Sequence, residues 1–173
     1  AVIKCKNYTH QTRYQLPIPP SPNLPNMKSI YLYPSTCFFE ATPVSLGRGT
    51  SLPFQVYGHP NMTGYNYSFT PRSIPGAKNP PQLNKLCHGV DLSNMSDEEI
   101  WKRGVDLTYV IDAYRNLNLD DHFFRPFFEL LVGRDYVRKM IKEGKSADEI
   151  KAMWKGDVEK FKAQRKPYLL YEE

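Results

Sequence analysis

The sequence predicts an α+β fold, a small, mainly antiparallel sheet with helices packed on one face. The first half of the 173-residue chain is rich in proline and tyrosine and holds short alternating segments bounded by Gly, Pro and Asn. The second half is charged and helical in pattern. No internal repeat divides the chain, and its length suits one domain with a real core. Residues 1–173 are therefore expected to form a single α+β domain.

The N-terminal segment is expected to be extended. "AVIKCKNY", residues 1–8, has the composition of a strand. "YQLPIPPSPNLPN", residues 14–26, contains prolines that remove backbone donors and favour polyproline II geometry. We expect Leu16–Pro25 to cross the surface as a stiff connector.

A first helix is predicted after this connector. Asn23 or Asn26 can cap it, and Pro34 is expected to kink or divide it before it ends ahead of Glu40. Its apolar positions are Met27, Ile30, Tyr31, Cys37 and Phe38.

Residues 44–92 are expected to supply three to five short strands. The segments "VSLGRG", "PFQVYGH", "YSFTPRSI" and "KLCHGVDL" are short, partly alternating and bounded by turn residues. A capping-box pattern, Ser96 to Glu99, then predicts a helix that Gly104 is expected to interrupt. Val110, Ile111 and Tyr114 are expected to face the core beyond that break.

Three more helices are predicted towards the C-terminus. "RPFFELLVG" and "RDYVRKMIKEG" read as short helices closed by Gly133 and Gly144, and Ser146 with Glu149 opens a longer one. Pro167 is expected to stop that helix before a final strand, "YLLY". The predicted core face of the long helix consists of Ile150, Met153, Trp154, Val158 and Phe161.

Composition excludes several classes of function. The net charge is +5, but basic residues are spread along the chain and interleave with acidic ones, which favours a solvated helix face over a nucleic-acid surface. The mean hydropathy is −0.56, and no apolar run approaches the roughly 18 residues of a membrane span. We therefore expect no nucleic-acid partner and no membrane span.

Metal and cofactor sites are not expected either. Three cysteines, Cys5, Cys37 and Cys87, are far apart and form no C-x-x-C pair, so buried thiols are expected instead of a zinc site or a disulfide. The four histidines form no His-x-x-x-His pair. No nucleophile elbow, P-loop or dinucleotide fingerprint is present, and no cofactor is predicted.

The stretch "FFEATPVSLGRGTSLPFQ", residues 38–55, carries the strongest candidate chemistry. Gly47 and Gly49 allow unusual dihedrals on either side of Arg48, and the guanidinium they present suits a carboxylate or phosphate. Arg48 could instead pair with Glu40 or cap carbonyls of the turn. Glu40 is a weak candidate for a general acid, because glycoside hydrolysis normally needs a second carboxylate and none is near in sequence.

Four motifs together carry a resemblance to a known family: "PIPPSPNLPN", "YLYPSTCFFEATPVSLGRGTSLPF", "LCHGVDL" and "RKPYLLY". They resemble the C-terminal part of the bacterial exo-β-N-acetylmuramidases, formerly a family of unknown function, over nearly the whole chain. The family pattern usually has Phe-Glu-Gly-Thr where this chain has Phe39-Glu40-Ala41-Thr42. The turn here is therefore expected to differ slightly.

The resemblance implies a function for the chain. Family members combine a Rossmann-like N-terminal catalytic domain with a smaller α+β domain and release N-acetylmuramic acid from non-reducing ends of peptidoglycan fragments in the interdomain cleft. By resemblance this chain is the second domain, its partner is its own N-terminal domain, and its setting is bacterial and extracytoplasmic. The catalytic residues are expected in the other domain, and a non-catalytic glycan-binding or interaction module remains the alternative.

The resemblance also suggests which residues contact the sugar. The lactyl carboxylate of N-acetylmuramic acid suits a bidentate arginine, and its hydroxyl and acetamido groups suit Ser, Thr and Asn. The substrate-binding candidates are Asn23, Glu40, Ser45, Arg48 and Thr50.

Overall fold

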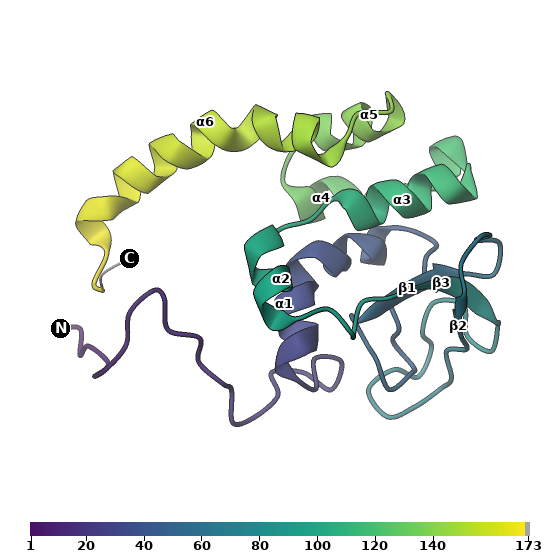
Figure 1. Ribbon diagram of the computed structural model, residues 1–173, viewed down its shortest axis with the longest axis horizontal. Helices are drawn as coiled ribbons and strands as arrows, with labels where there is room; N and C mark the ends of the chain where they lie inside the picture. Colours follow the sequence, from purple (N-terminus) through teal and green to yellow (C-terminus); the bar gives the residue numbers. More distant parts are fainter. Residues whose placement is uncertain (172–173) are drawn as a thin grey trace.

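One small sheet with helices gathered beside it makes up the body of the molecule, as Figure 1 shows for the computed structural model, which describes residues 1–171. Strands β1 (Val56–His59), β2 (Tyr67–Phe69) and β3 (Cys87–Asp91) pair antiparallel in the order β1-β3-β2. The predicted α+β class with a small antiparallel sheet is confirmed.

The helices follow the order expected from the sequence. In the described chain they are α1 (Met27–Thr36), α2 (Asp97–Arg103), α3 (Thr108–Leu117), α4 (Phe128–Val132), α5 (Tyr136–Lys142) and α6 (Ala147–Arg165). Short 3₁₀ helices are η1 (Cys37–Ala41), η2 (Asp120–His122) and η3 (Lys166–Tyr168). No helix within residues 1–171 combines the length and apolar character needed to cross a membrane.

The predicted capping residues are where the helices begin and end. Asn26 caps α1 by accepting from the Ser29 amide at 2.9 Å, and Ser146 opens α6 in a capping box with Glu149. Gly133 ends α4 with a φ of 71°. Because these contacts are local, short sequence patterns sufficed to predict them.

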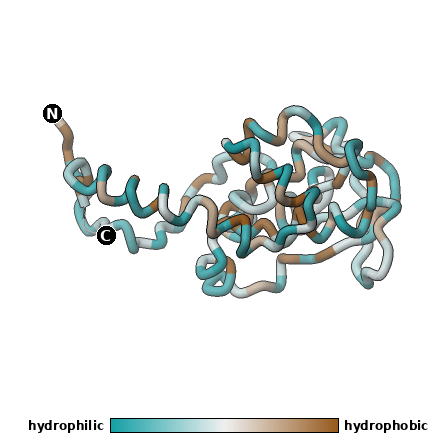
Figure 2. Tube along the Cα trace, turned by 90° about the horizontal axis from the view of Figure 1, so that it is seen from above, coloured by the Kyte–Doolittle hydropathy of each residue, from teal (hydrophilic) through white to brown (hydrophobic). Residues whose placement is uncertain are grey.

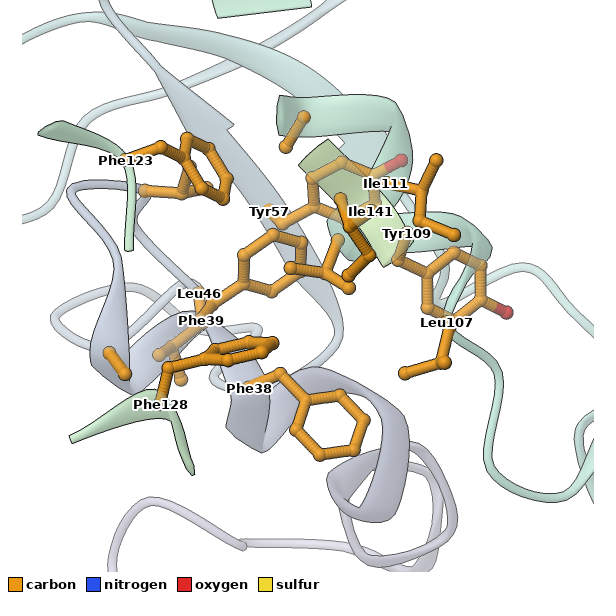
Figure 3. Close-up of a cluster of buried hydrophobic side chains, with 14 of the residues drawn as sticks. Phe38, Phe39, Leu46, Tyr57, Leu107, Tyr109, Ile111, Phe123, Phe128 and Ile141 are labelled. Carbon is orange, nitrogen blue, oxygen red and sulfur yellow. The ribbon is translucent and has the colours of Figure 1, made fainter. Parts of the chain in front are cut away.

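The main core joins the helices to one face of the sheet. The ring of Phe39, from η1, stacks on Tyr57 of β1 with centroids 4.9 Å apart, and Phe38 packs near Phe128 of α4, as Figure 3 shows. Val110 and Ile111 are buried in this core, as predicted, and Tyr114 packs against it. Fully burying each such large side chain stabilises the fold by about 1.5–3 kcal/mol.

The opposite sheet face covers a smaller apolar cluster. Val56, Phe69 and Cys87 are its buried members, and Leu52 and Tyr67 pack against them. The loop that contains Leu52 is therefore fixed to the back of the sheet, and the same loop carries the glycine-flanked arginine.

Three predicted strands are wrong. Residues 1–8 form no strand and are exposed, and residues 168–171 form η3 and irregular chain. The segment "VSLGRG" makes a single bridge, Ser45 to Gly58. Each segment has strand composition, but composition does not supply a pairing partner, and of these residues only Ser45 pairs with the sheet, at Gly58.

Two predictions of burial also need correction. Ile150 is buried and Trp154 packs against the core, but Met153, Val158 and Phe161 are exposed because α6 leaves the body after its first turns (Figure 1). Of the three thiols, Cys87 is buried, Cys37 is partly buried and Cys5 is exposed. Leu16–Pro25 does cross the surface without helix or strand, with a small turn closed between Ser21 and Leu24.

Candidate functional site

Glu40 is partly exposed on a short helix in which three of the other side chains are buried. In η1 the neighbouring Phe38, Phe39 and Ala41 are buried, while the Glu40 side chain keeps 29% of its surface exposed. The carbonyl of Ala41 accepts from the Arg125 amide at 2.9 Å, which ties the end of η1 to the chain before α4. The core therefore fixes the backbone on both sides of the carboxylate.

The glycine turn is held closely against neighbouring backbone. Gly47 and Gly49 have φ angles of 81° and 84°, and a Cβ at Gly49 would lie 2.4 Å from the Arg72 carbonyl oxygen. The Gly49 carbonyl in turn accepts from the Arg72 amide at 2.8 Å. Only glycine fits at position 49. The neighbouring backbone therefore fixes the conformation of the turn and the position of the Arg48 backbone.

Arg48 reaches Glu40 but is not fully satisfied by it. Their closest nitrogen–oxygen distance is 4.0 Å, and 35% of the Arg48 side-chain surface remains exposed. The Nε atom of Arg48 is buried and has no hydrogen-bond partner among residues 1–171. A guanidinium prefers several short, aligned bonds, so Arg48 retains capacity for a further acceptor.

Burial dominates the ionisation of Glu40. Desolvation raises the pKa of the carboxyl above its ordinary value, and the positive charge of Arg48 only partly opposes this. Within the described chain, Arg48 is the charged side chain that shifts this pKa. The carboxyl is therefore easier to protonate than a free glutamic acid.

Tyr33 and Cys37 complete the corner around Glu40. Burial raises the pKa of the Cys37 thiol to about 11, and the charge of Glu40 adds to the effect. Burial, then Glu40, likewise raises the pKa of Tyr33, whose ring packs on Phe54 with centroids 5.0 Å apart. Both groups are neutral at pH 7, so the corner carries one carboxyl and one guanidinium.

Sequence reasoning missed Tyr33, Cys37 and Phe54. The spacing of Tyr33, Cys37 and Glu40, at i, i+4 and i+7, is that of one helical face and could have indicated the first two. Phe54 has a φ of 60°, which is rare for an aromatic residue, and no sequence signal marks it.

The structure brings Ser45 and Thr50 to the same turn and gives each a local partner. Thr50 donates from Oγ1 to the Gly47 carbonyl at 2.7 Å and accepts from the Leu52 amide. Ser45 is fully buried, and its Oγ accepts from the Gly47 amide at 3.4 Å. Both hydroxyls shape the turn, and their predicted contact with sugar stays a prediction.

Asn23 lies in a different turn. Its side-chain amide donates to the Gly76 carbonyl at 3.0 Å, and its backbone amide donates to the Ser21 hydroxyl. Its hydrogen bonds in the described chain join it to neither Glu40 nor Arg48, so its predicted role in binding also stays a prediction.

No group of three or more His, Cys, Asp or Glu side chains within residues 1–171 is placed to hold a metal ion. What the corner offers chemically is recognition of an anion by Arg48 beside a carboxyl that accepts a proton readily. Both groups are presented on backbone that the core and the glycine turn fix in place.

Comparison with known proteins gives one family match. Residues 31–171 match the family model described as exo-beta-N-acetylmuramidase NamZ, C-terminal. The peptidoglycan beta-N-acetylmuramidase NamZ of Bacillus subtilis (strain 168) is 32% identical over 189 residues, which cover 98% of this chain and 45% of that protein.

Two solved structures from Bacteroides fragilis NCTC 9343, both of DUF1343 family proteins, are similar. One is 83% identical with a TM-score of 0.98, and the match covers 100% of this chain and 49% of the other. The second is 20% identical with a TM-score of 0.62, and its match, which shows likeness of fold alone, covers 90% of this chain and 45% of the other. The chain thus spans less than half the length of the relatives it matches.

Proposed function

The chain belongs to the family of NamZ C-terminal domains, and from that premise we propose that it serves an exo-β-N-acetylmuramidase as one wall of its substrate cleft. The larger enzyme would release N-acetylmuramic acid from non-reducing ends of peptidoglycan fragments. Its other wall would be a Rossmann-like N-terminal domain. Because peptidoglycan lies outside the cytoplasmic membrane, the proposed setting is extracytoplasmic.

The observation that carries the proposal is the incompletely satisfied Arg48 beside Glu40. N-acetylmuramic acid differs from N-acetylglucosamine by a lactyl group, which adds a carboxylate. Arg48 keeps 35% of its side-chain surface exposed and makes only a 4.0 Å contact to Glu40, so a ligand carboxylate could accept hydrogen bonds from the exposed side of Arg48. Arg48 would therefore distinguish the two sugars.

Glu40 alone is insufficient for hydrolysis by the usual route. Glycosidases place two carboxyl groups across the scissile bond, about 5–9.5 Å apart. The groups coupled to Glu40 in the described chain are the Arg48 guanidinium, the Tyr33 hydroxyl and the Cys37 thiol, and none of them is a carboxyl. We therefore assign the catalytic residues to the other part of the enzyme and leave to Glu40 a role in orienting Arg48 and the sugar.

A second candidate function is a glycan-binding module without a share in the catalytic cleft. The single carboxyl of the corner favours it, because binding needs no acid–base pair. In that case the chain would hold muramic acid without affecting the rate of bond cleavage.

The test is Arg48→Ala in the longer enzyme. We expect kcat/KM on an N-acetylmuramic acid β-glycoside to fall about 10- to 100-fold, as loss of a charged hydrogen bond worth roughly 1.5–3 kcal/mol implies. On the N-acetylglucosamine glycoside the value should change little. The melting temperature should also change little, since partly exposed ion pairs contribute about 0–1 kcal/mol.

Two further variants sharpen the result. Arg48→Lys keeps the charge but loses the planar fork, so it should restore only part of the preference. Arg72→Ala removes a neighbouring exposed arginine that bonds to Asn84 at 3.1 Å, and it should leave the preference intact. A large loss of stability with unchanged sugar preference would mean that Arg48 locks the turn and does not bind substrate.

A further inference from the structure

The apolar stripe of α6 is buried at its start and uncovered at its end. Ile150, Trp154, Val158 and Phe161 follow one another at i, i+4, i+8 and i+11, which places them along one side of the helix. Ile150 is fully buried and Trp154 partly, whereas Val158 is 42% and Phe161 61% exposed. The helix therefore presents its core-facing side to solvent where it extends beyond the body (Figure 1).

Three hollows connect this stripe to the body of the molecule. A hollow of about 430 Å³ lies beside Trp101, and one of about 340 Å³ lies beside Trp154; Pro34 and Val105 line both. A third, of about 590 Å³, continues from Trp154 along α6 past Val158 and Phe161, and charged side chains such as Arg134 and Asp157 line it as well. We call the line through Trp101, Pro34, Val105, Trp154, Val158 and Phe161 the apolar track.

The N-terminal segment of the chain runs to the same end of the molecule. The Cys5 amide donates to the Tyr171 hydroxyl at 2.8 Å, and the Arg13 guanidinium lies 5.1 Å from the ring centroid of Trp101. Figure 2 shows the N-terminal segment beside the end of α6, away from the main body. Any chain that precedes residue 1 would thus begin next to the track.

The relatives indicate what such a preceding chain would be. The matched family is a C-terminal one, and the matched region is 45% of the Bacillus subtilis protein and 49% of the closely similar Bacteroides fragilis protein. In those relatives the remaining length is comparable to that of this chain. A covalently joined neighbour acts at millimolar effective concentration, which a second copy in dilute solution does not reach.

We propose that the apolar track is the surface on which the N-terminal part of the longer protein docks, an inference that rests on the proposed membership of a two-domain enzyme. Phe161 and Val158 would insert into that part, and Trp154 and Trp101 would pack at the boundary. Cys37, which lines the middle hollow, lies one turn before Glu40 in η1. Docking on the track would therefore bring the N-terminal part to the rim of the Glu40–Arg48 corner.

The test measures amide hydrogen exchange of residues 156–164 in the longer protein. An overhanging helix end frays and exchanges fast, whereas a docked one is protected. We expect Phe161→Glu to speed exchange in this segment at least about tenfold relative to wild type. Ala163→Glu is the matched control: the two positions are two residues apart, hence on nearly opposite sides of the helix, and exchange should stay slow.

Three outcomes would overturn the proposal. Fast exchange of residues 156–164 in the wild type would show that nothing covers this end of α6. Equal changes in exchange rate for Phe161→Glu and Ala163→Glu would show that the apolar side of α6 is not the docked side. Protection that disappears on dilution would assign the track to a second copy of the chain. Muramidase activity is measured separately. If the longer protein shows slow exchange that depends on Phe161 but has no muramidase activity, the docking surface is supported and the proposed function is wrong.

Discussion

Glu40 and Arg48 lie in a corner where burial and charge oppose each other. Desolvation raises the pKa of Glu40, and Arg48 at 4.0 Å lowers it by less. A carboxyl whose folded pKa is raised contributes stability that is fully present below its unfolded pKa and is lost as pH rises through the folded value. At neutral pH the charged form of Glu40 is therefore a cost to the fold, which a binding role would explain.

The variant Glu40→Gln tests this sign. Glu40→Gln removes the titrating carboxyl, so the melting temperature of the variant minus that of wild type should increase as pH rises from 4 to 7. Glu98→Gln is the control, because its hydrogen bond to Arg13 lowers the pKa of Glu98 and the difference should change in the opposite direction. Parallel melting curves for Glu40→Gln and wild type across this range would show that Glu40 is not destabilised by burial.

The backbone of the glycine turn can be tested by a matched pair of substitutions. Gly49 and Gly64 have nearly equal φ angles, 84° and 83°, but a Cβ at Gly64 would meet nothing within 4 Å. Gly64→Ala should cost about 1–2 kcal/mol for the left-handed conformation alone. Gly49→Ala should cost roughly 3 kcal/mol or more, because its methyl also meets the Arg72 carbonyl. Equal unfolding free energies in urea would mean that the turn relaxes freely.

At the scale of elements, the start of α6 depends on local sequence, whereas the burial of its apolar side depends on the tertiary structure. Its start is defined by the Ser146 and Glu149 capping box, with the Glu149 carboxylate 2.8 Å from the Ser146 amide. Its apolar side was predicted from periodicity, but the body covers only the first part of it. Capping depends on four neighbouring residues, whereas burial depends on where the helix ends relative to the rest of the molecule.

Ser146→Ala is expected to lower stability by about 1 kcal/mol, and the melting temperature by about 2–4 °C. Bonds from the Ser146 backbone, then Lys145 and the Ser146 hydroxyl, hold the pKa of Glu149 at about 2, so the stabilisation from the charged carboxylate is present above about pH 4.5 and is lost as pH falls through 2. Ser146→Ala keeps the first two contacts and loses the hydroxyl bond to the carboxylate at 3.0 Å, so only the part of the stability difference that comes from this bond should disappear at pH 2.

Ser96→Ala at the start of α2 provides the comparison for Ser146→Ala. There Ser96 accepts from the Glu99 amide, but the Glu99 carboxylate pairs with Arg103 at 2.8 Å. Ser96→Ala should therefore lower the stability less than Ser146→Ala does. A Ser146→Ala variant as stable as wild type at pH 7 would contradict the proposed contribution of the capping box to the stability of the fold.

On the scale of the whole molecule, the chain combines the Glu40–Arg48 corner, which we propose as one side of a substrate site, with an uncovered apolar track. The sheet and helices fix the corner from behind, and α6 with the N-terminal segment extends to one end (Figure 2). Both features are expected of a part that works against a second body.

The 173-residue chain alone is expected to release no N-acetylmuramic acid from peptidoglycan fragments or a chromogenic β-glycoside. The reason is that hydrolysis by the usual route needs two carboxyl groups across the scissile bond, and we assign the catalytic residues to the other part of the enzyme. Product is measured by chromatography beside the longer enzyme as positive control. Release by the chain that disappears in Glu40→Gln would show that the catalytic group was assigned to the wrong part.

The sequence by itself determined the fold class, the order of the main helices, the caps at Ser96 and Ser146, the glycine-flanked arginine and the family. These depend on residues within a few positions of one another or on long specific motifs. Only the tertiary structure decided that Ser45 is buried, that the Asn23 side chain bonds to Gly76, that Tyr33 and Cys37 adjoin Glu40, and that residues 1–8 and 168–171 are not strands. Burial and strand pairing depend on which distant segments meet, and composition does not specify that meeting.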